Sequence, residues 1–243
     1  SQKVIAGVAS HALEVIVACE EAGLDPDFYQ KTLHPTDYCL GPQPGETGYF
    51  GKCDNWWCNN PDEVVEFMHS VKKPWIACVR SQNEGGNWQA GDTEKIRELM
   101  DAVELGAEIV DIELRTHNLK RALPPIKKRA TCILSLHEPE KTPPLDELKR
   151  VVQQQLDAGA DICKVITTAR SFSDNLTTLQ LITEYPRIKM VSFAMGPLGI
   201  TSRILCPLVS GYLTYASLKA GKESAPGQIT VSQLRKIYRM MAK

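Results

Sequence analysis

A lysine stands inside a short, mostly apolar run of the sequence, Ala160-Asp161-Ile162-Cys163-Lys164-Val165-Ile166. The run is typical of a buried parallel strand, and Lys164 lies toward its C-terminal end, where a barrel of parallel strands carries its chemistry. Burial disfavours a charged amine, so we expect a neutral amine that acts as a nucleophile. The alternative is an ordinary lysine that extends its ammonium group from the strand end into solvent.

Further residues, all polar except Met195, follow the other predicted strands, at positions that such a barrel gathers on one face. They are Arg80 and Glu84, Glu113 and Arg115, His137, Met195, Arg203, Ser224 and Gln228. A lysine imine acidifies the neighbouring C–H bond, a histidine moves protons near neutral pH, and the planar fork of an arginine binds a carboxylate. The set therefore predicts imine chemistry on a small ketone that bears a carboxylate.

Several of these residues have a plainer interpretation when each is taken alone. His137 is then a structural histidine bonded to the backbone, and Arg203 a surface residue near the start of a helix. The loop Ser224–Gln228, with its proline and glycine, is either a flap over the mouth or a simple connector between strand and helix. Their convergence on one mouth favours the functional interpretation.

Short apolar strands alternate with amphipathic helices along the whole chain. We expect strands over about 3–9, 28–33, 75–80, 109–115, 130–136, 161–167, 188–194 and 212–216. We expect helices over about 11–22, 61–72, 93–105, 118–127, 145–158, 173–184, 200–209 and 230–242, with Pro124-Pro125 breaking the fourth and a long loop over 34–60. Eight such units predict an α/β fold, a single (β/α)8 TIM barrel over residues 1–243.

The composition is that of an ordinary globular protein. The chain has 243 residues, a formal net charge of −1 and 43% hydrophobic residues, which argues against nucleic acid or an anionic membrane as a partner. It has no apolar run of the roughly 20 residues that span a membrane, and no signal peptide is visible. The eight scattered cysteines favour reduced thiols in the cytoplasm, and Ser1 in place of methionine suggests a trimmed start.

The loop over 34–60 contains four residues that bind metals in other proteins: His34, Cys39, Cys53 and Cys58. The spacing of Cys53 and Cys58 is not that of a usual zinc pair, so we expect packed thiols and no metal. The neighbouring pair Trp56-Trp57 is interpreted as a hydrophobic cap on the barrel or a partner surface.

From about Pro74 to the C-terminus the sequence resembles the type I 3-dehydroquinate dehydratases of the shikimate pathway. The resemblance is carried by six segments: Arg80-Ser81-Gln82-Asn83-Glu84-Gly85-Gly86, Ile109-Val110-Asp111-Ile112-Glu113-Leu114, Ser135-Leu136-His137 with Lys141-Thr142-Pro143, Ala160-Asp161-Ile162-Cys163-Lys164, Met195-Gly196 with Ser202-Arg203-Ile204-Leu205-Cys206, and Ser224-Ala225-Pro226-Gly227-Gln228.

The resemblance implies a reaction and three catalytic roles. The chain would dehydrate 3-dehydroquinate to 3-dehydroshikimate without a metal or organic cofactor. Lys164 would form an imine with the C3 ketone. His137 would remove the C2 proton, assist imine formation and hydrolysis, and protonate the departing C1 hydroxyl, while Glu84 orients it.

The resemblance also implies a set of substrate-binding residues. Arg203 would bind the substrate carboxylate, Ser224 and Gln228 would add hydrogen bonds from the flap, Arg80 would contact substrate hydroxyls, and Met195 would pack near the ring. Glu113 matches a family segment in which a glutamate is usual, and we place it in this set.

The first quarter of the chain departs from the family. Its second strand normally carries a Glu-x-Arg pair followed by an aspartate, which hold substrate hydroxyls. The run Asp27-Phe28-Tyr29-Gln30-Lys31-Thr32-Leu33-His34 has no such pair. Residues about 4–77 look more like another barrel family, with atypical first two βα units over about 4–73. The sequence therefore suggests an engineered chimera whose dehydroquinase-like part covers about 74–243.

Three functions remain open on these residues. The first is an active dehydratase with weakened turnover, because each missing buried hydrogen bond removes about 1–3 kcal/mol of binding. The second is a chimeric or designed scaffold with little or no activity. The third is a non-enzymatic sensor for similar ligands. The sequence leaves a homodimer open.

Overall fold

Eight of the described strands form a nearly closed ring. The computed structural model describes residues 4–10, 13–33, 38–40, 51–53, 70–86 and 88–241. Within these, eight parallel strands lie in the order β10-β1-β2-β5-β6-β7-β8-β9. They are β1 (Ala6–Ser10), β2 (Tyr29–Thr32), β5 (Trp75–Cys78), β6 (Ile109–Glu113), β7 (Thr131–His137), β8 (Ile162–Thr168), β9 (Met190–Met195) and β10 (Thr214–Ala216).

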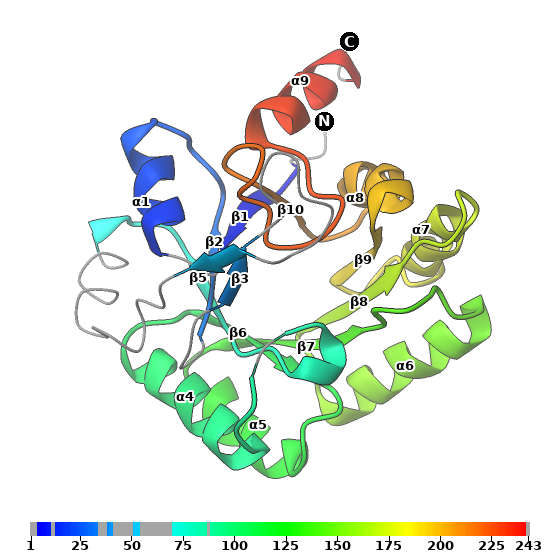
Figure 1. Ribbon diagram of the computed structural model, residues 1–243. Coiled ribbons are helices and arrows are strands. Elements are labelled where there is room, and N and C mark those ends of the chain that lie inside the picture. Colours follow the sequence, from blue (N-terminus) through cyan, green and yellow to red (C-terminus); the bar gives the residue numbers. More distant parts are fainter. Residues whose placement is uncertain are drawn as a thin grey trace.

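The two edge strands of this sheet meet. The amide of Tyr212, just ahead of β10, donates to the carbonyl oxygen of Met190 at the start of β9, at 2.6 Å. Figure 1 shows the strands around a common centre with the helices outside them. The predicted (β/α)8 barrel is confirmed.

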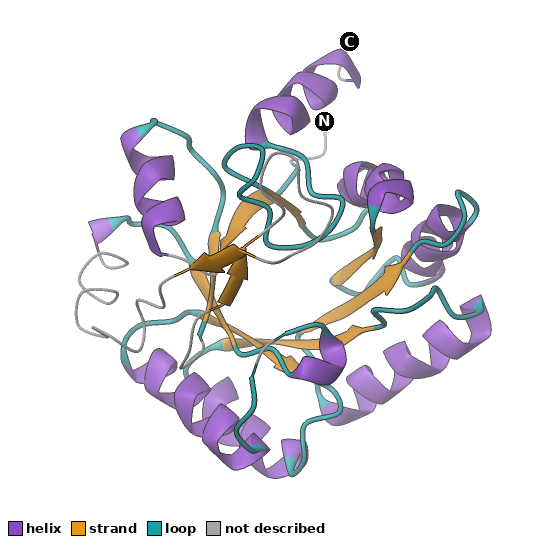
Figure 2. Cartoon of the chain, in the orientation of Figure 1, coloured by secondary structure: helices purple, strands orange, loops and turns teal. Residues whose placement is uncertain are grey.

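Seven α-helices of the described residues surround the strands (Figure 2). They are α1 (Leu13–Glu21), α4 (Asp92–Glu104), α5 (Leu119–Lys127), α6 (Leu145–Ala158), α7 (Asp174–Glu184), α8 (Ile200–Leu205) and α9 (Val231–Met241). The sequence sets the ends of α6 clearly. Asp146 and Glu147 lie in its first turn, where they complement the helix dipole, and Gly159 ends it in the left-handed conformation at φ 94°. None of the described helices has the length and apolar character needed to cross a membrane.

Alternation along the strands decides which side chains face the inside of the barrel. On β8, Lys164, Ile166 and Thr168 line the interior, while the intervening Cys163 and Val165 are buried on the other face. Both faces of each strand are covered, which is why the strands read as nearly continuous apolar runs.

Two predicted helices differ in the structure. The helix α5 continues through Pro124 and Pro125 instead of breaking, because its buried face outweighs the lost backbone hydrogen bonds; that face comprises Leu119, Ala122, Leu123 and Ile126. The predicted helix over 200–209 is α8 followed by a 3-10 turn, η3 (Cys206–Val209). Pro207 cannot donate to the carbonyl of Arg203, and the Thr214 hydroxyl donates to that carbonyl instead, at 2.9 Å.

The segment predicted as a long loop contains a short antiparallel ribbon. Its strands are β3 (Tyr38–Leu40) and β4 (Gly51–Cys53), paired with Tyr38 opposite Cys53. The loop prediction is wrong for these residues, since two three-residue strands give too little alternation to be recognised. His34, Trp56, Trp57, Cys58 and most of the predicted helix over 61–72 lie outside the described residues.

Candidate active site

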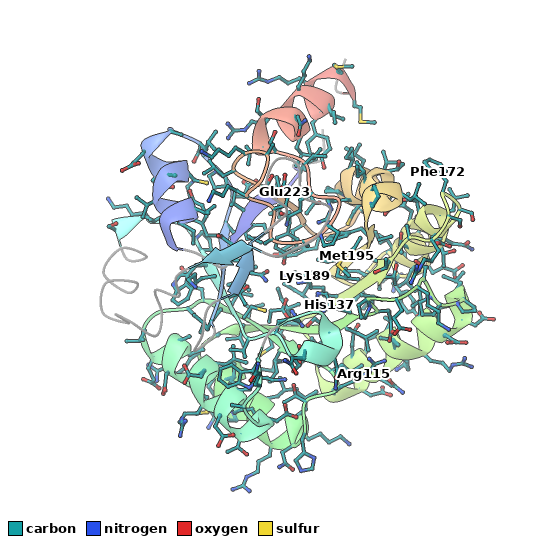
Figure 3. The ribbon with its side chains drawn as sticks, in the orientation of Figure 1. Arg115, His137, Phe172, Lys189, Met195 and Glu223 are labelled. Carbon is teal, nitrogen blue, oxygen red and sulfur yellow. The ribbon has the colours of Figure 1, made fainter. Side chains whose placement is uncertain are left out.

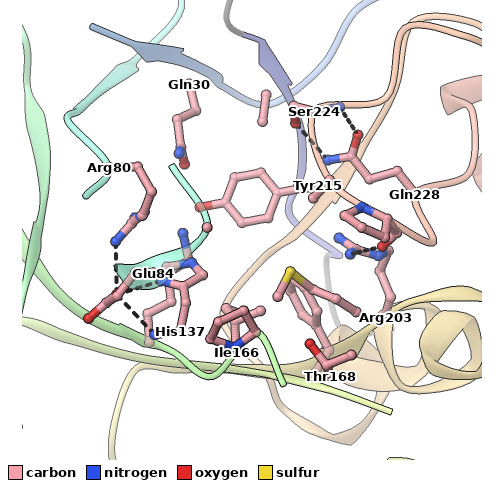
Figure 4. A pocket seen from close by; sticks show the side chains of 18 of the residues that line it. Gln30, Arg80, Glu84, His137, Ile166, Thr168, Arg203, Tyr215, Ser224 and Gln228 are labelled. Atoms are coloured by element: carbon pink, nitrogen blue, oxygen red, sulfur yellow. Dashed lines mark hydrogen bonds and ion pairs between the residues drawn. The ribbon is translucent and has the colours of Figure 1, made fainter. Parts of the chain in front are cut away.

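A pocket of about 320 Å³ opens at the C-terminal ends of the barrel strands. All the predicted site residues except Glu113 and Arg115 line it. Its polar lining comprises Gln30, Thr32, Arg80, Glu84, His137, Lys164, Thr168, Arg203, Tyr215, Ser224 and Gln228. Figure 4 shows several of these side chains pointing into the same space from different strands and loops.

Lys164 is buried inside the barrel, with only 4% of its surface exposed. Its Nζ donates to Asp111 Oδ2 at 2.7 Å and lies 5.0 Å from the centre of the Tyr215 ring. Its backbone carbonyl accepts a hydrogen bond from Gln155 Nε2 on α6, and the same Nε2 bonds the carbonyl of Leu134. The helix thus fixes the strand that carries the amine, and the alternative of a lysine reaching into solvent is wrong.

Asp111, on β6, links the lysine to Arg80. Its Oδ1 accepts from Arg80 Nη2 at 2.8 Å and from the Ser135 hydroxyl at 2.6 Å. Burial alone would raise the pKa of Asp111, but Arg80 and Lys164 outweigh it and hold that pKa well below its usual range. Asp111 is therefore an anion in the barrel interior, bonded to Arg80 on one side and to Lys164 on the other.

His137 ends β7 and is held by one carboxylate oxygen. Glu84 Oε2 accepts from the backbone amide of His137 at 3.0 Å and lies 3.0 Å from its Nδ1. An Nδ1–H that donates to this oxygen leaves Nε2 with a free lone pair. Burial, then the positive charges of Arg80 and Lys164, hold the pKa of His137 well below its usual value, so the ring is neutral and suited to accept a proton.

The electrostatics of Glu84 differ from those of Asp111. Burial raises the pKa of Glu84 to about 7, only partly opposed by Arg80, whose Nη1 lies 3.3 Å from Oε2. Its other oxygen, Oε1, has no hydrogen-bond partner among the described residues. Glu84 and His137 therefore form a pair in which one proton can be gained or lost near neutral pH.

Glu113 lies behind the pocket wall and not in it. Its carboxylate accepts from the Ser81 amide at 2.8 Å and from Lys95 Nζ at 2.6 Å, and lies 3.3 Å from Arg80 Nη1. The prediction that Glu113 binds substrate is therefore corrected: the family segment places a glutamate here, but its oxygens are turned toward Lys95 and Arg80. These bonds fix the position of the Arg80 guanidinium.

Arg203 and the final loop form the opposite rim. Arg203 is buried on α8, stacks on the Phe193 ring at 4.3 Å, and donates to the carbonyl of Pro226 at 3.3 Å. The loop is closed by Gln228, which bonds the amide of Ser224 through Oε1 and its hydroxyl through Nε2, both at 2.9 Å. The predicted Ser224–Gln228 loop therefore lies over the mouth beside Arg203.

Arg115 does not belong to this group. The strand β6 ends at Glu113, and Arg115 turns outward, 56% exposed, to an ion pair with Glu138 at 2.6 Å. Figure 3 shows His137 and Met195 near the middle of the mouth and Arg115 toward its periphery. Its predicted place at the mouth is therefore wrong, because the predicted strand was two residues too long.

No cluster of three or more His, Cys, Asp or Glu residues suited to a metal is found among the described residues. The side chains of Cys39 and Cys53 and the whole of His34 and Cys58 lie outside that set. The charged groups of the pocket pair with one another instead, which is an arrangement for proton transfer and for binding an anionic substrate.

The model of the type I 3-dehydroquinase family matches residues 53–243. The chain belongs to this family. A 3-dehydroquinate dehydratase from Dehalococcoides mccartyi is 45% identical over 169 residues, covering 70% of this chain and 76% of the relative. One from Methanocaldococcus jannaschii is 39% identical over 174 residues, covering 70% and 78%. The predicted family and its lyase activity, 3-dehydroquinate dehydration, are confirmed.

The fold likeness extends over the first quarter of the chain as well. The 3-dehydroquinate dehydratase of Geobacillus kaustophilus superposes with a TM-score of 0.82 at 21% identity, covering 100% of this chain and 92% of its own. The type I enzyme of Clostridium difficile gives 0.80 at 19% identity, covering 99% and 93%. These matches do not favour the chimeric alternative, since the whole chain has the type I 3-dehydroquinase fold.

Several residues of the site were not predicted from the sequence, among them Gln30 and Tyr215, which line the pocket, and Asp111, which bonds Lys164 but does not line it. Asp111 has a readable signal, because it alternates with Glu113 inside an apolar strand and an acid there must be paired. Gln30 and Tyr215 are uncharged residues of short strands and carry no comparable signal.

Proposed function

We propose that Lys164 forms the imine through which this chain dehydrates 3-dehydroquinate, with His137 as the proton carrier. The observation that carries the proposal is that the buried Lys164 amine and the His137 ring held by Glu84 line one pocket with Arg203. Lys164 supplies the amine that imine formation needs. His137 supplies a group that can take up and release a proton near neutral pH, and Arg203 can bind the carboxylate that the substrate carries.

The chemistry begins at Lys164. Its Nζ gives up a proton to His137 Nε2 and attacks the C3 carbonyl, and a second proton moves from nitrogen to the carbonyl oxygen to give the carbinolamine. His137 then returns its proton to the carbinolamine hydroxyl, which leaves as water to give the iminium. Asp111 keeps the amine oriented beforehand through the 2.7 Å bond to Nζ. The iminium then draws the electron pair of the C2–H bond toward nitrogen, which lowers the cost of removing that proton.

His137 moves the protons. Its Nε2 takes the C2 proton, and Glu84, at 3.0 Å from Nδ1, stabilises the imidazolium that forms. The same proton is then given to the C1 hydroxyl, which leaves as water as the enamine re-forms the iminium. Hydrolysis of this iminium releases 3-dehydroshikimate and restores the Lys164 amine, so no electrons or atoms are left over.

The pocket rim positions the substrate. Arg203, with Ser224 and Gln228 on the flap beside it, binds the carboxylate in this proposal, and Met195 packs against the ring. Arg80 lines the pocket, but it is bonded to Asp111 and to Ser135, at 2.8 and 2.9 Å. Its larger contribution is therefore to hold Asp111, with any hydroxyl contact secondary.

Steady-state formation of the conjugated enone, followed by its absorbance, tests the function. We expect turnover of 3-dehydroquinate, and a loss of about 10⁴-fold or more in kcat for Lys164→Met, as for removal of a covalent nucleophile. Lys189→Met is the matched control, since Lys189 also lies over an aromatic ring, Tyr212 at 5.2 Å, but lines no part of the pocket. Well-folded protein without turnover would contradict the proposal and favour the scaffold or sensor.

We also propose a cytoplasmic location. The five cysteines whose side chains are described are Cys19, Cys78, Cys132, Cys163 and Cys206, and all are free and buried. Burial raises the pKa of Cys163 to about 12, which keeps it an unreactive thiol. Free thiols of this kind persist in a reducing compartment. Fractionation of the native host, with antibody detection, is expected to place the chain with cytoplasmic markers; recovery with extracytoplasmic markers would contradict it.

A homodimer is a further proposal. Phe172 and Leu176 are 61% and 63% exposed beside Leu198, and Asn175 Nδ2 bonds the carbonyls of Phe172 and Leu198. The three apolar side chains therefore belong to one surface, which a second copy would cover. Sedimentation should give a dimer for the parent chain and a monomer for Phe172→Ser with Leu176→Ser. A monomeric parent chain would contradict it.

A further inference from the structure

Two uncharged side chains of the pocket wall each have a buried polar atom with no hydrogen-bond partner among the described residues: Gln30 Oε1 and Tyr215 Oη. Their side chains line the pocket and are 7% and 4% exposed. A native structure retains few such atoms, because each has lost its water without gaining a partner. Two of them in one cavity indicate a ligand that supplies the missing hydrogen bonds.

The strand register explains why the wall itself offers Gln30 no partner. On β2, Gln30 and Thr32 face inward by alternation and line the pocket, and Phe28, just ahead of the strand, is in phase with them. Gln30 is in register with Ala9 of β1 on one side and with Ile76 of β5 on the other, and neither side chain can donate a hydrogen bond. The Gln30 amide is therefore held in the interior with apolar neighbours on both sides.

Tyr215, on β10, is held in place by β1 and by the Phe28 ring. Gly7 of β1 is its register partner, and a side chain at Gly7 would collide with the Phe28 ring, which stacks edge-on against Tyr215 at 5.5 Å between centroids. This packing fixes the phenol ring across the interior. Figure 4 shows its hydroxyl end directed toward the side of the pocket where Gln30 and Arg80 lie.

The sheet order places Gln30 across the barrel from the lysine. In the ring of eight strands, β2 is four strands from β8 in either direction. Arg203 follows β9, the neighbour of β8. A six-membered ring with its ketone at Lys164 and its carboxylate at Arg203 therefore presents its remaining edge toward β2.

We propose that Gln30 and Tyr215 are specificity-determining residues that hydrogen-bond the C4 and C5 hydroxyls of the substrate ring; this inference rests on the proposed function. The amide oxygen of Gln30 accepts from one hydroxyl, and the Tyr215 hydroxyl donates to or accepts from the adjacent one. Both groups are neutral, so this end of the pocket selects a hydroxyl-bearing edge. An analogue with hydrogen in place of those hydroxyls leaves the two atoms unpaired.

The test pairs two variants with two kinds of substrate. Gln30→Met keeps the length of the side chain and removes its acceptor, and Tyr215→Phe removes only the hydroxyl. The substrates are 3-dehydroquinate and its analogues that lack the C4 or the C5 hydroxyl. We expect Gln30→Met to lower kcat/KM for 3-dehydroquinate about tenfold, the effect of one buried hydrogen bond. It should change kcat/KM less than about twofold for the analogue that lacks the matching hydroxyl.

A stability measurement separates recognition from a structural role. Gln30→Met removes a buried acceptor that has no partner, so we expect its midpoint of thermal unfolding to equal or exceed that of the parent chain. A lower midpoint together with equal losses on every substrate would overturn the inference, as would an unchanged kcat/KM for 3-dehydroquinate. If the parent chain itself gives no enone, the proposed function has failed instead, and the two failures are thereby distinguished.

Discussion

The two halves of the barrel mouth differ in how their polar groups are bonded. In the half formed by β5 to β8, Asp111 bonds Arg80 at 2.8 Å and Lys164 at 2.7 Å. The His137 ring lies 3.0 Å from Glu84, which in turn lies 3.3 Å from Arg80. On β2 and β10 the lining is neutral, and two buried atoms lack a partner among the described residues.

This difference indicates a division of work. The bonded half keeps its reacting groups in position before the substrate arrives, so little reorganisation is needed during the reaction. The neutral half becomes fully hydrogen-bonded only with a ligand present, so it contributes to recognition. Hydrogen bonds between neutral groups are weaker than those to charged groups. Because this half lacks the Glu-x-Arg pair, we still predict weakened turnover.

After the loss of Lys164 itself, the largest effect should come from the proton carrier of the bonded half, His137. His137→Gln keeps a polar side chain of similar reach but cannot carry a proton near neutral pH. We expect kcat to fall by about 10²–10⁴-fold, the usual contribution of general acid–base catalysis. Enone absorbance measures this loss. A fall of less than tenfold would place proton transfer on another group.

The second effect tests whether the charges of that half depend on one another. Asp111→Asn removes the anion between Lys164 and Arg80, both of which are buried. We expect the free energy of unfolding to fall by about 3 kcal/mol, as when one partner of a buried ion pair is removed. We expect kcat/KM to fall by about 10²-fold as Lys164 loses its orientation. Denaturant titration and steady-state kinetics measure both, and unchanged stability would show that the ion pairs are dispensable.

The third effect concerns pH. Glu84, with its pKa raised to about 7, must be ionised to stabilise the His137 imidazolium. We therefore expect kcat/KM of the parent chain to rise as the pH increases through about 7. Glu84→Gln should remove that limb and lower kcat/KM about tenfold at pH 8. A limb that persists in Glu84→Gln would assign the titration to another group.

Stability gives an independent check on the same residue. The folded chain binds the Glu84 proton more tightly than the unfolded chain, so this group destabilises the fold progressively as the pH rises from about 4.5 to about 7. The lowered pKa of His137 acts with the opposite sign: it costs stability as the pH falls below about 6.5. Glu84→Gln should remove the first slope and leave the second, as measured by denaturant titration across pH.

The smallest effect should come from Arg115, which lies outside both halves. Its side chain is 56% exposed and its ion pair with Glu138 is at the surface. We expect Arg115→Ala to change kcat/KM by less than about twofold and the free energy of unfolding by less than about 0.5 kcal/mol. A tenfold loss of activity would show that Arg115 acts at the barrel mouth, as the sequence predicted.

The bonded half was largely predictable from the sequence. Lys164 and His137 are polar residues near the ends of apolar strands. An ionisable group in such a place is costly to bury and therefore indicates a paired or functional group. Asp111 stands in the same kind of strand, and alternation with Glu113 gives its direction. The distance of one strand end from another was not predictable, and for that reason Glu113 and Arg115 were placed in the pocket when neither lines it.

The neutral half was not predictable, for a physical reason. Gln30 is an uncharged residue in a strand of four residues, where neither periodicity nor charge marks a site. Its significance depends on the absence of a hydrogen-bond partner from Ala9 or Ile76, and that absence follows only from the strand register. The continuity of α5 through Pro124 is a similar case, since tertiary packing of its buried face overrides the local preference.

The central claim is that the bonded half forms a covalent imine at Lys164. Borohydride reduction in the presence of 3-dehydroquinate, followed by mass spectrometry of the digested chain, tests it most directly. We predict a stable adduct on the peptide that carries Lys164, absent without substrate and absent in Lys164→Ala. A well-folded chain that gives no adduct, or an adduct that persists on another residue in Lys164→Ala, would contradict the account.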